Sequence, residues 1–272
     1  MLLASQIAPG LGAAFGYAAL AVLATVALAF VVGRITKRYR DIDVFWPLGF
    51  VAVALTTFFS SSGGVGTDGL QRGLLLAMVS IWGLRLALHL GWRGRGEPED
   101  PRYAAIMRGA RDRNQTLYAL VVIYGLQAVL LYVVSITVIV GMYASSPVRA
   151  VEFVGLGIWV LGFGFESIGD FQLERFKKNP ANRGTVMNRG LWAWTRHPNY
   201  FGDATAWWGT FLVAAAGGWG LVAIMCPLLM TRLLTSVSGK PLLERRMAKT
   251  RQGFDEYVAT TPAFFPRPPS RR

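Results

Sequence analysis

The sequence contains few of the residues that disulfide-bonded, metal-dependent or soluble nucleotide-binding proteins rely on. It has one cysteine and two histidines among 272 residues, and 15 acidic against 28 basic residues. The single cysteine, Cys226, cannot form an intramolecular disulfide, and its apolar surroundings predict a core position. No grouping of His, Cys and Asp has metal-ligand spacing, so no metal is expected. Neither a glycine fingerprint of a dinucleotide fold nor a Gly-Lys-Ser/Thr phosphate loop occurs, so any nucleotide would be held by helices and loops.

Long apolar runs make up most of the chain, of which 53% is hydrophobic. The runs are continuous rather than alternating, which favours helices over a membrane barrel. Since a span needs roughly 20 mainly apolar residues, we expect an all-α polytopic membrane protein with about seven transmembrane helices. The expected spans are 11–33, 43–60, 70–91, 117–142, 148–172, 200–217 and 219–237.

The basic residues alternate between loops, with 4 in 34–40, 6 in 92–116, 6 in 173–200 and 8 in 238–272. This is the positive-inside pattern of a multispanning protein, and it predicts an outside N-terminus and a cytoplasmic C-terminus. It also argues against nucleic-acid binding, despite a net charge of +13. The chain starts without the basic region and cleavage site of a signal peptide, so the first run is expected to be retained. We expect an integral protein of a bacterial inner membrane.

Polar side chains concentrate in the second half. We expect one transmembrane domain, in which 1–148 form the substrate side and 149–272 form the cofactor-binding helices and a cytoplasmic tail. A transporter would place its polar groups near the bilayer midplane. Here they gather at one face, which favours a cytoplasmic cofactor meeting a membrane-embedded substrate.

The candidate cofactor residues surround the cytoplasmic ends of the last three expected spans. Glu166 and Asp170 are four residues apart, so they share one helical face, and carboxylates inside a span are functional by default. The basic loop after them could clamp phosphates. The stretch 195–203 opens a helix at Pro198, whose free N–H groups suit an anionic ligand. The predicted cofactor residues are Glu166, Asp170, Lys177, Lys178, Arg196, His197, Asn199, Tyr200, Asp203, Glu244, Arg245, Arg246 and Tyr257.

Simpler interpretations of the same residues stay open. Glu166 and Asp170 could form ion pairs at a helix end, His197 could cap a helix, and Tyr200 could belong to an interfacial aromatic belt. The stretch from 242 to 257 could be an amphipathic helix on anionic lipid, and the loop 93–103 could be a plain surface loop.

The first half offers fewer candidates. Tyr103, Asp43 and His89 are the predicted catalytic residues, because each could donate a proton. Arg85 lies inside an apolar run and needs an anionic or carbonyl partner. The predicted substrate-binding residues are Trp46, Trp82 and Arg85.

These residues carry a family resemblance over roughly residues 40 to 268. The chain resembles the steroid 5-alpha-reductase-like membrane proteins, in particular the bacterial branch called domain of unknown function 1295. The resemblance rests on Asp43-Val44-Phe45-Trp46, Trp82-Gly83-Leu84-Arg85-Leu86, Glu99-Asp100-Pro101-Arg102-Tyr103, the run from Glu166 to Gln172, the run from Arg196 to Gly209, and Ser238-Gly239 with Glu244.

The resemblance implies a seven-helix reductase that transfers hydride from NADPH to an activated carbon–carbon double bond in a lipid. The family's cofactor residues are matched by Asp170, Lys177, Asn199, Gly202 and Asp203, with Glu166 where the steroid reductases have Asn. Their substrate-binding Gln-Glu pair and Tyr have no counterpart here: the second span offers Asp43, and Trp82 stands where the Tyr belongs.

Two other functions stay open. Arg196-His197-Pro198 with Tyr200, Gly202, Glu244 and Tyr257 also resembles isoprenylcysteine carboxyl methyltransferases, which use S-adenosylmethionine. A lipid-binding scaffold without activity would leave the same polar groups as packing residues. We favour an NADPH-dependent membrane oxidoreductase acting on a steroid-like or other unsaturated lipid, with membrane lipids as surroundings and no obligate protein partner.

Overall fold

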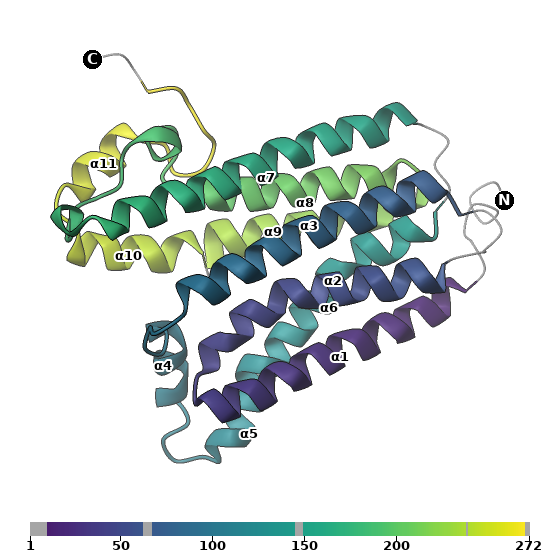
Figure 1. Cartoon of the computed structure of the whole chain (residues 1–272), viewed down its shortest axis with the longest axis horizontal. Helices are drawn as coiled ribbons and strands as arrows, with labels where there is room; N and C mark the ends of the chain where they lie inside the picture. The colour runs from purple at the N-terminus through teal and green to yellow at the C-terminus, as the bar shows by residue number, and fades with distance from the viewer. Residues whose placement is uncertain (1–9, 62–66, 145–148, 238, 270–272) are drawn as a thin grey trace. The chain divides into compact units, whose positions relative to one another are not determined.

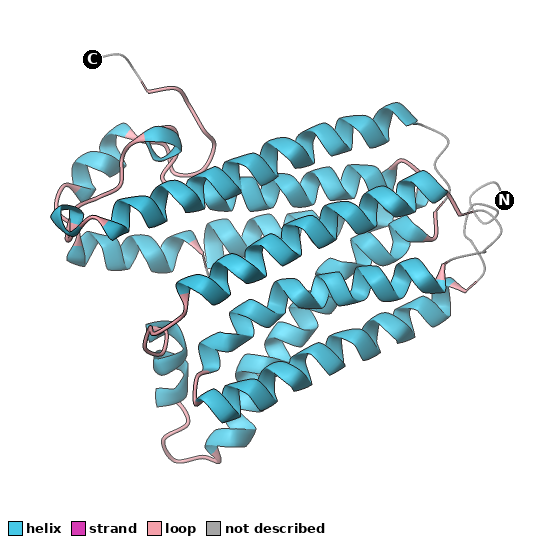
Figure 2. Ribbon diagram, in the orientation of Figure 1, coloured by secondary structure: helices cyan, strands magenta, loops and turns pink. Residues whose placement is uncertain are grey.

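The structure is a computed structural model that describes residues 10–61, 67–144, 149–237 and 239–269. In these ranges it consists of helices and loops and contains no strand (Figure 2). The α-helices are α1 (Leu11–Thr36), α2 (Ile42–Ser60), α3 (Gly69–Arg93), α4 (Pro101–Arg108), α5 (Gln115–Ala119), α6 (Leu126–Met142), α7 (Arg149–Lys178), α8 (Pro198–Ala215), α9 (Met225–Arg232), α10 (Lys240–Thr250) and α11 (Phe254–Thr260). Short 3-10 segments are η2 (Tyr39–Asp41), η4 (Pro180–Asn182), η5 (Gly190–Ala193) and η6 (Trp219–Ile224), and η3 (Leu120–Gly125) and η7 (Leu233–Val237) are π-helical.

Six helical segments of the described chain are long and apolar enough to cross a membrane. They are Leu11–Thr36, Tyr39–Ser60, Gly69–Arg93, Gln115–Met142, Arg149–Lys178 and Gly220–Val237. The expected all-α membrane fold is therefore confirmed. The seventh expected span, 200–217, does form a helix, α8, but α8 is not among the six because its first turns contain polar residues. The seventh crossing and the sidedness of the termini stay predictions, and residue 148 of the fifth expected span lies outside the described residues.

Internal packing divides the chain into two compact units. The first unit is Met1–Glu152 with Val213–Cys226, and the second is Phe153–Leu212 with Pro227–Arg272. The long helix α7 begins in the first unit and continues in the second. The division of roles expected at residue 148 stays a prediction.

In the first unit, α1, α2, α3 and α6 pack together (Figure 1). Helix α1 shows how: small residues face inward and large apolar residues such as Leu20 and Ile35 face outward. Close backbone approach through small side chains drives helix association in lipid, where hydrophobic burial contributes little. The buried residues of α1 are Ala14, Ala18, Val22, Val26, Ala29 and Gly33.

Helix α2 contains Pro47, and α3 approaches it at Gly83. A Cβ on Gly83 would lie 2.8 Å from the Pro47 carbonyl oxygen, so only glycine permits this contact. The buried Cys226 also belongs to this unit, where its thiol contacts the Val133 carbonyl oxygen at 3.2 Å. Its predicted core position is confirmed.

In the second unit, α7 and α8 run antiparallel and side by side (Figure 1), held by glycines spaced seven residues apart. Gly162 and Gly202 face each other: a Cβ on Gly202 would lie 2.5 Å from the Gly162 carbonyl oxygen. Farther along, a Cβ on Gly209 would lie 2.5 Å from the Trp159 backbone nitrogen and 2.6 Å from the Gly155 carbonyl oxygen. The two backbones therefore touch, which leaves no room for a side chain along this seam.

The rest of the second unit closes around these helices. The Trp208 indole donates a hydrogen bond to the Thr231 hydroxyl at 3.1 Å, which joins α8 to α9. Helix α10 packs against η7 and α11. The Gln252 backbone N–H donates to the Gly184 carbonyl at 2.8 Å, which joins the α10–α11 turn to the loop after α7.

The seam predicts a strong asymmetry between two glycine-to-alanine changes. We expect Gly209→Ala to destabilise the protein by about 1–3 kcal/mol, because the new methyl group overlaps backbone atoms that cannot move aside. On the same helix pair, a Cβ on Gly157 would meet nothing within 4 Å, so Gly157→Ala should be neutral or slightly stabilising. Thermal unfolding in detergent compares the two; equal melting temperatures would show that the seam is not tight.

Candidate functional site

The second unit brings a carboxylate and an amide together at the start of α8. Asp170 lies on α7 and is 5% exposed; the Asn199 side-chain amide donates a hydrogen bond to it at 3.1 Å. Gly169 makes this possible, since a Cβ there would already lie 3.2 Å from the Pro198 ring. Glu166 lies one turn before Asp170 and is also buried. Asp170 and Asn199 are thus in direct contact, and the role of all three residues in cofactor binding stays a prediction.

A second polar cluster joins the segment before α8 to α10. Glu244 accepts hydrogen bonds on one carboxylate oxygen from Arg196 Nε and from His197 Nε2, both at 2.9 Å. The His197 ring stacks on Tyr200 with centroids 5.4 Å apart and planes 4° from parallel. Within the described chain, His197 Nδ1 has no hydrogen-bond partner although the residue is fully buried. With Nε2 donating to Glu244, a neutral ring leaves Nδ1 as a buried acceptor that a ligand could satisfy.

Arg196 has a further set of partners in the tail. Its Nη1 donates to the carbonyl oxygens of Val258 at 3.1 Å and Thr261 at 2.7 Å, and its backbone N–H donates to Pro262 at 3.0 Å. Arg196 is only 7% exposed. We therefore expect this guanidinium to hold the tail in place rather than to reach a phosphate directly.

The C-terminal tail, residues 257–267, is hydrogen-bonded along the segment from 192 to 196. The Tyr257 hydroxyl donates to the Trp192 carbonyl at 2.6 Å, and the Thr195 hydroxyl donates to the Phe264 carbonyl at 2.9 Å. Farther along, the Arg267 backbone N–H donates to the Trp194 carbonyl at 2.9 Å. Tyr257 is buried, so the structure gives it a structural contact. No sequence pattern marked these carbonyl partners, since any residue supplies a carbonyl.

The pKa values of Glu244 and His197 are both lowered in this cluster. Burial works against ionised Glu244, but the hydrogen bonds from His197 and Arg196 outweigh it and lower the pKa of Glu244 to about 2. Burial lowers the pKa of His197 below its ordinary value, with Arg196 adding to the effect against the pull of Glu244. We infer an ionised Glu244 paired with Arg196 and a neutral imidazole at neutral pH.

The other predicted cofactor residues of this unit differ in exposure. Asp203 is 9% exposed, one turn after Asn199 on α8. Lys177 pairs with Glu174 at 3.0 Å on the exposed end of α7. The remaining predicted cations are exposed: Lys178, Arg245 and Arg246. Their roles in cofactor binding stay predictions.

In the first unit, Asp43 receives a partner on each carboxylate oxygen. Tyr103 donates its hydroxyl proton to Oδ1 at 2.5 Å, and Arg102 Nη2 donates to Oδ2 at 2.8 Å. The loop 94–100 adds two contacts between α4 and the start of α2. Asp100 caps α4, and Glu99 accepts the Arg40 backbone N–H at 3.0 Å. This cluster anchors α4 to the start of α2, so the loop is more than a plain surface loop.

Tyr103 is a poor proton donor in this setting. Burial and the adjacent Asp43 carboxylate both raise the pKa of its phenol above the ordinary value. Two predicted catalytic residues, Tyr103 and Asp43, are thus hydrogen-bonded to each other, in an arrangement that suits holding α4 in place better than donating a proton. His89 lies outside this cluster, half-buried on α3.

Two of the predicted substrate-binding residues, Trp46 and Trp82, both contact the ring of Phe50. Phe50 packs edge-on against Trp46, with centroids 4.8 Å apart, and against Trp82, with centroids 5.8 Å apart. Arg85 is half-buried three residues after Trp82, on the same face of α3 as His89. Sequence reasoning did not identify Phe50, which is fully buried between the two tryptophans.

Comparison with known protein families assigns most of the chain to one family. A family model described as "Protein of unknown function (DUF1295)" matches residues 29–261, which include Asp43, Asp170, Asn199 and Glu244. The chain belongs to this family. The predicted family is therefore confirmed, while the resemblance to steroid reductases is not tested by the match.

Two curated relatives differ in what they suggest. The family member is 24% identical over 220 residues to an uncharacterized protein of Schizosaccharomyces pombe, covering 69% of this chain and 63% of that protein. It is 35% identical over 78 residues to a probable O-methyltransferase of Ustilaginoidea virens, covering 29% of this chain and 26% of that protein. The chain thus spans less than two thirds of either relative. No solved structure matches.

The Glu244 cluster predicts an acid-sensitive tail. The pKa of Glu244 falls from 4.5 to about 2 on folding, so its stabilisation is complete above pH 4.5 and is lost as the pH falls towards 2. We expect Glu244→Gln to cost about 1–3 kcal/mol at pH 7, because Arg196 keeps its burial and loses its counter-ion. The variant should also lose this pH dependence. Thermal melts from pH 7 to pH 3 test it, with the exposed Asp255→Asn on α11 as control; parallel pH profiles for wild type and Glu244→Gln would contradict the assignment.

Proposed function

We propose that this family member is a membrane reductase that uses NADPH to reduce an activated carbon–carbon double bond in a lipid. One observation carries the proposal: Asp170 and Asn199 are hydrogen-bonded, and the chain between them carries exposed cations at the end of α7 and in the loop after it. These exposed cations are Arg175, Lys177, Lys178, Arg183 and Arg189.

The chemistry of the pair and of the loop fits such a cofactor. A buried carboxylate accepts hydrogen bonds from ribose hydroxyls or a carboxamide, and an amide can both donate and accept. Cations at a helix end and in a loop bind phosphates. The unpartnered His197 Nδ1 provides one more buried polar atom in the second unit.

The charge of the ligand favours NADPH over its rival. NADPH carries a pyrophosphate and a 2′-phosphate, whereas S-adenosylmethionine carries neither, and five exposed cations between 175 and 189 would be unnecessary for the latter. Bound NADPH supplies the hydride. The chain's own residues would orient it, exclude water and deliver the proton to the neighbouring carbon.

For the acceptor, we propose a hydrophobic molecule such as a steroid-like 3-oxo-4-ene or another unsaturated lipid. The supporting observation is the aromatic series Trp46, Phe50 and Trp82 in membrane-spanning helices. Because the Tyr103 hydroxyl donates to Asp43 and its pKa is raised, His89 is the proton donor that we favour among the three candidates.

A methyltransferase is the second candidate, since one relative is described as a probable O-methyltransferase. In that case the same second unit would bind S-adenosylmethionine, and a lipid or prenylated molecule would accept the methyl group. The exposed cations would then serve the membrane surface.

Cofactor binding separates the two candidates. We expect NADPH to raise the melting temperature of the purified protein in detergent, because its phosphates engage the exposed loop, and S-adenosylmethionine to leave it unchanged. NADH, which lacks the 2′-phosphate, should stabilise less. Stabilisation by S-adenosylmethionine alone would replace the reductase with the methyltransferase.

The Asp170–Asn199 pair should decide NADPH affinity. We expect Asp170→Asn and Asn199→Ala each to weaken NADPH binding about tenfold or more, because each removes a hydrogen bond involving a charged group. Titration by intrinsic fluorescence measures this. The controls are Asp255→Asn on α11 and Asn188→Ala in the loop, two exposed residues of the same types. If the paired and control variants bind NADPH equally, the pair lies outside the cofactor site.

A further inference from the structure

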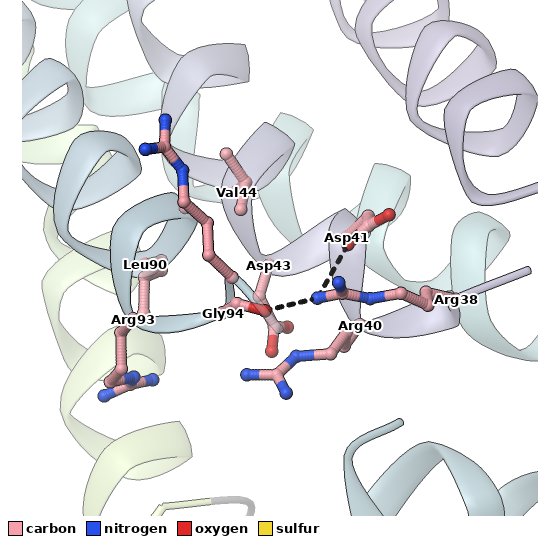
Figure 3. Close-up of a pocket in the computed structure, with 10 residues that line it drawn as sticks. Arg38, Arg40, Asp41, Asp43, Val44, Leu90, Arg93 and Gly94 are labelled. Atoms are coloured by element: carbon pink, nitrogen blue, oxygen red, sulfur yellow. Dashed lines mark hydrogen bonds and ion pairs between the residues drawn. The ribbon is translucent and has the colours of Figure 1, made fainter. Parts of the chain in front are cut away.

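A pocket lined by arginines opens in the first unit, where α1 ends, α2 begins and α3 ends (Figure 3). Four arginines and two aspartates contribute to its wall: Arg38, Arg40, Arg93, Arg95, Asp41 and Asp43. We propose that this pocket binds the phosphate-bearing head group of an anionic membrane lipid.

The two aspartates offset only part of the charge of the four arginines. Asp43 is taken by Tyr103 and Arg102, as described above. Asp41 accepts the Thr36 hydroxyl at 2.6 Å and lies 3.5 Å from Arg38. Among the described residues, Arg40, Arg93 and Arg95 form no ion pair with a carboxylate, so net positive charge remains at the pocket.

Two guanidinium groups converge on the end of α3. Arg38 Nη2 donates to the Gly94 carbonyl at 2.8 Å, and Figure 3 shows Arg38 and Arg40 extending from the same side towards Gly94. A Cβ on Gly94 would lie 3.5 Å from Arg38 Nη2 and 3.6 Å from Arg40 Nη2. The absence of a side chain at Gly94 keeps this space open.

Several donors in the pocket have no acceptor among the residues that the structure describes. Arg38 Nε is buried and unpaired, and the side chains of half-buried Arg93 and exposed Arg95 have no hydrogen-bond or ion-pair partner in the described ranges. Buried N–H donors are normally satisfied, because leaving one unpaired is unfavourable. Oxygen atoms of a phosphate would satisfy such donors, and guanidinium groups bind phosphate through paired N–H bonds.

The size of the pocket limits what can enter. Its volume is about 130 Å³, below the roughly 300–1,000 Å³ of pockets that enclose drug-sized ligands. A head group fits this volume, whereas a dinucleotide does not. The residues that line the pocket all belong to the first unit, whereas the proposed cofactor residues belong to the second.

The setting favours a lipid over a soluble anion. The pocket lies at the ends of three of the membrane-spanning segments, and its wall includes the apolar Val44 and Leu90 from two of them. Basic pockets between transmembrane helices on one side of the membrane are typical binding sites of anionic head groups. Acyl chains could follow the apolar wall while the phosphate meets the arginines.

The test compares lipids in nanodiscs. We expect the full-length protein to melt at a higher temperature in phosphatidylcholine nanodiscs that contain cardiolipin than in phosphatidylcholine alone. The double variant Arg93→Gln, Arg95→Gln should lose most of this gain, and it should fold because neither side chain has a structural partner in the described ranges. The control is Arg108→Gln, Arg111→Gln, which removes the same charge from exposed residues of the same unit outside the pocket.

The outcomes separate the sources of the anion. Equal loss of the cardiolipin effect in both double variants would reduce it to general surface charge and overturn the proposal. Stabilisation of the detergent-purified protein by inorganic phosphate or pyrophosphate, lost in Arg93→Gln, Arg95→Gln and without a cardiolipin effect, would assign the pocket to a soluble anion instead. NADPH stabilisation should be the same in wild type and both double variants, so failure of the cofactor proposal would not be mistaken for failure of this one.

Discussion

Direct backbone contact between α7 and α8 is the constraint on which the second unit depends. Gly202 and Gly209 on α8 meet Gly162 and Gly155 on α7, so the helices approach until main chain touches main chain. A lipid environment offers little hydrophobic gain for helix association, and close van der Waals packing takes its place. The contact sets the register in which Asn199 reaches Asp170. A shift of one turn along the seam would separate the two side chains by about 5.4 Å.

The tail adds a second constraint that acts through hydrogen bonds. Arg196 contacts Glu244 and the carbonyls of Val258 and Thr261, so a single buried guanidinium joins the start of α8 to three positions of the C-terminal region. Removing a partner from such a cluster leaves a buried charge behind, which costs more than the lost contact itself. Burial lowers the pKa of His197 in this cluster, and its ring stacks on Tyr200.

Charge has different uses in the two units. In the second unit, the cations after Asp170 are exposed, which suits a ligand that arrives from water. In the first unit, arginines at the ends of three spans line a small pocket, and others such as Arg102 are consumed in holding α4. The positive-inside pattern describes the whole set. Only the contacts show which arginines hold helices together and which have side-chain N–H groups without a partner in the described ranges.

The sequence by itself determined the class of fold, because hydropathy is a local property that sums over roughly 20 residues. It also identified Asp170, Asn199 and the family, since unusual polar residues at span ends are visible without coordinates. The tertiary structure decided the partners. The Tyr103–Asp43 bond, the Arg196 clasp and the pocket at Gly94 join residues about 50 to 65 positions apart, and such distances close only when the helices pack. Carbonyl acceptors and glycine contacts depend on backbone position, which no side-chain pattern records.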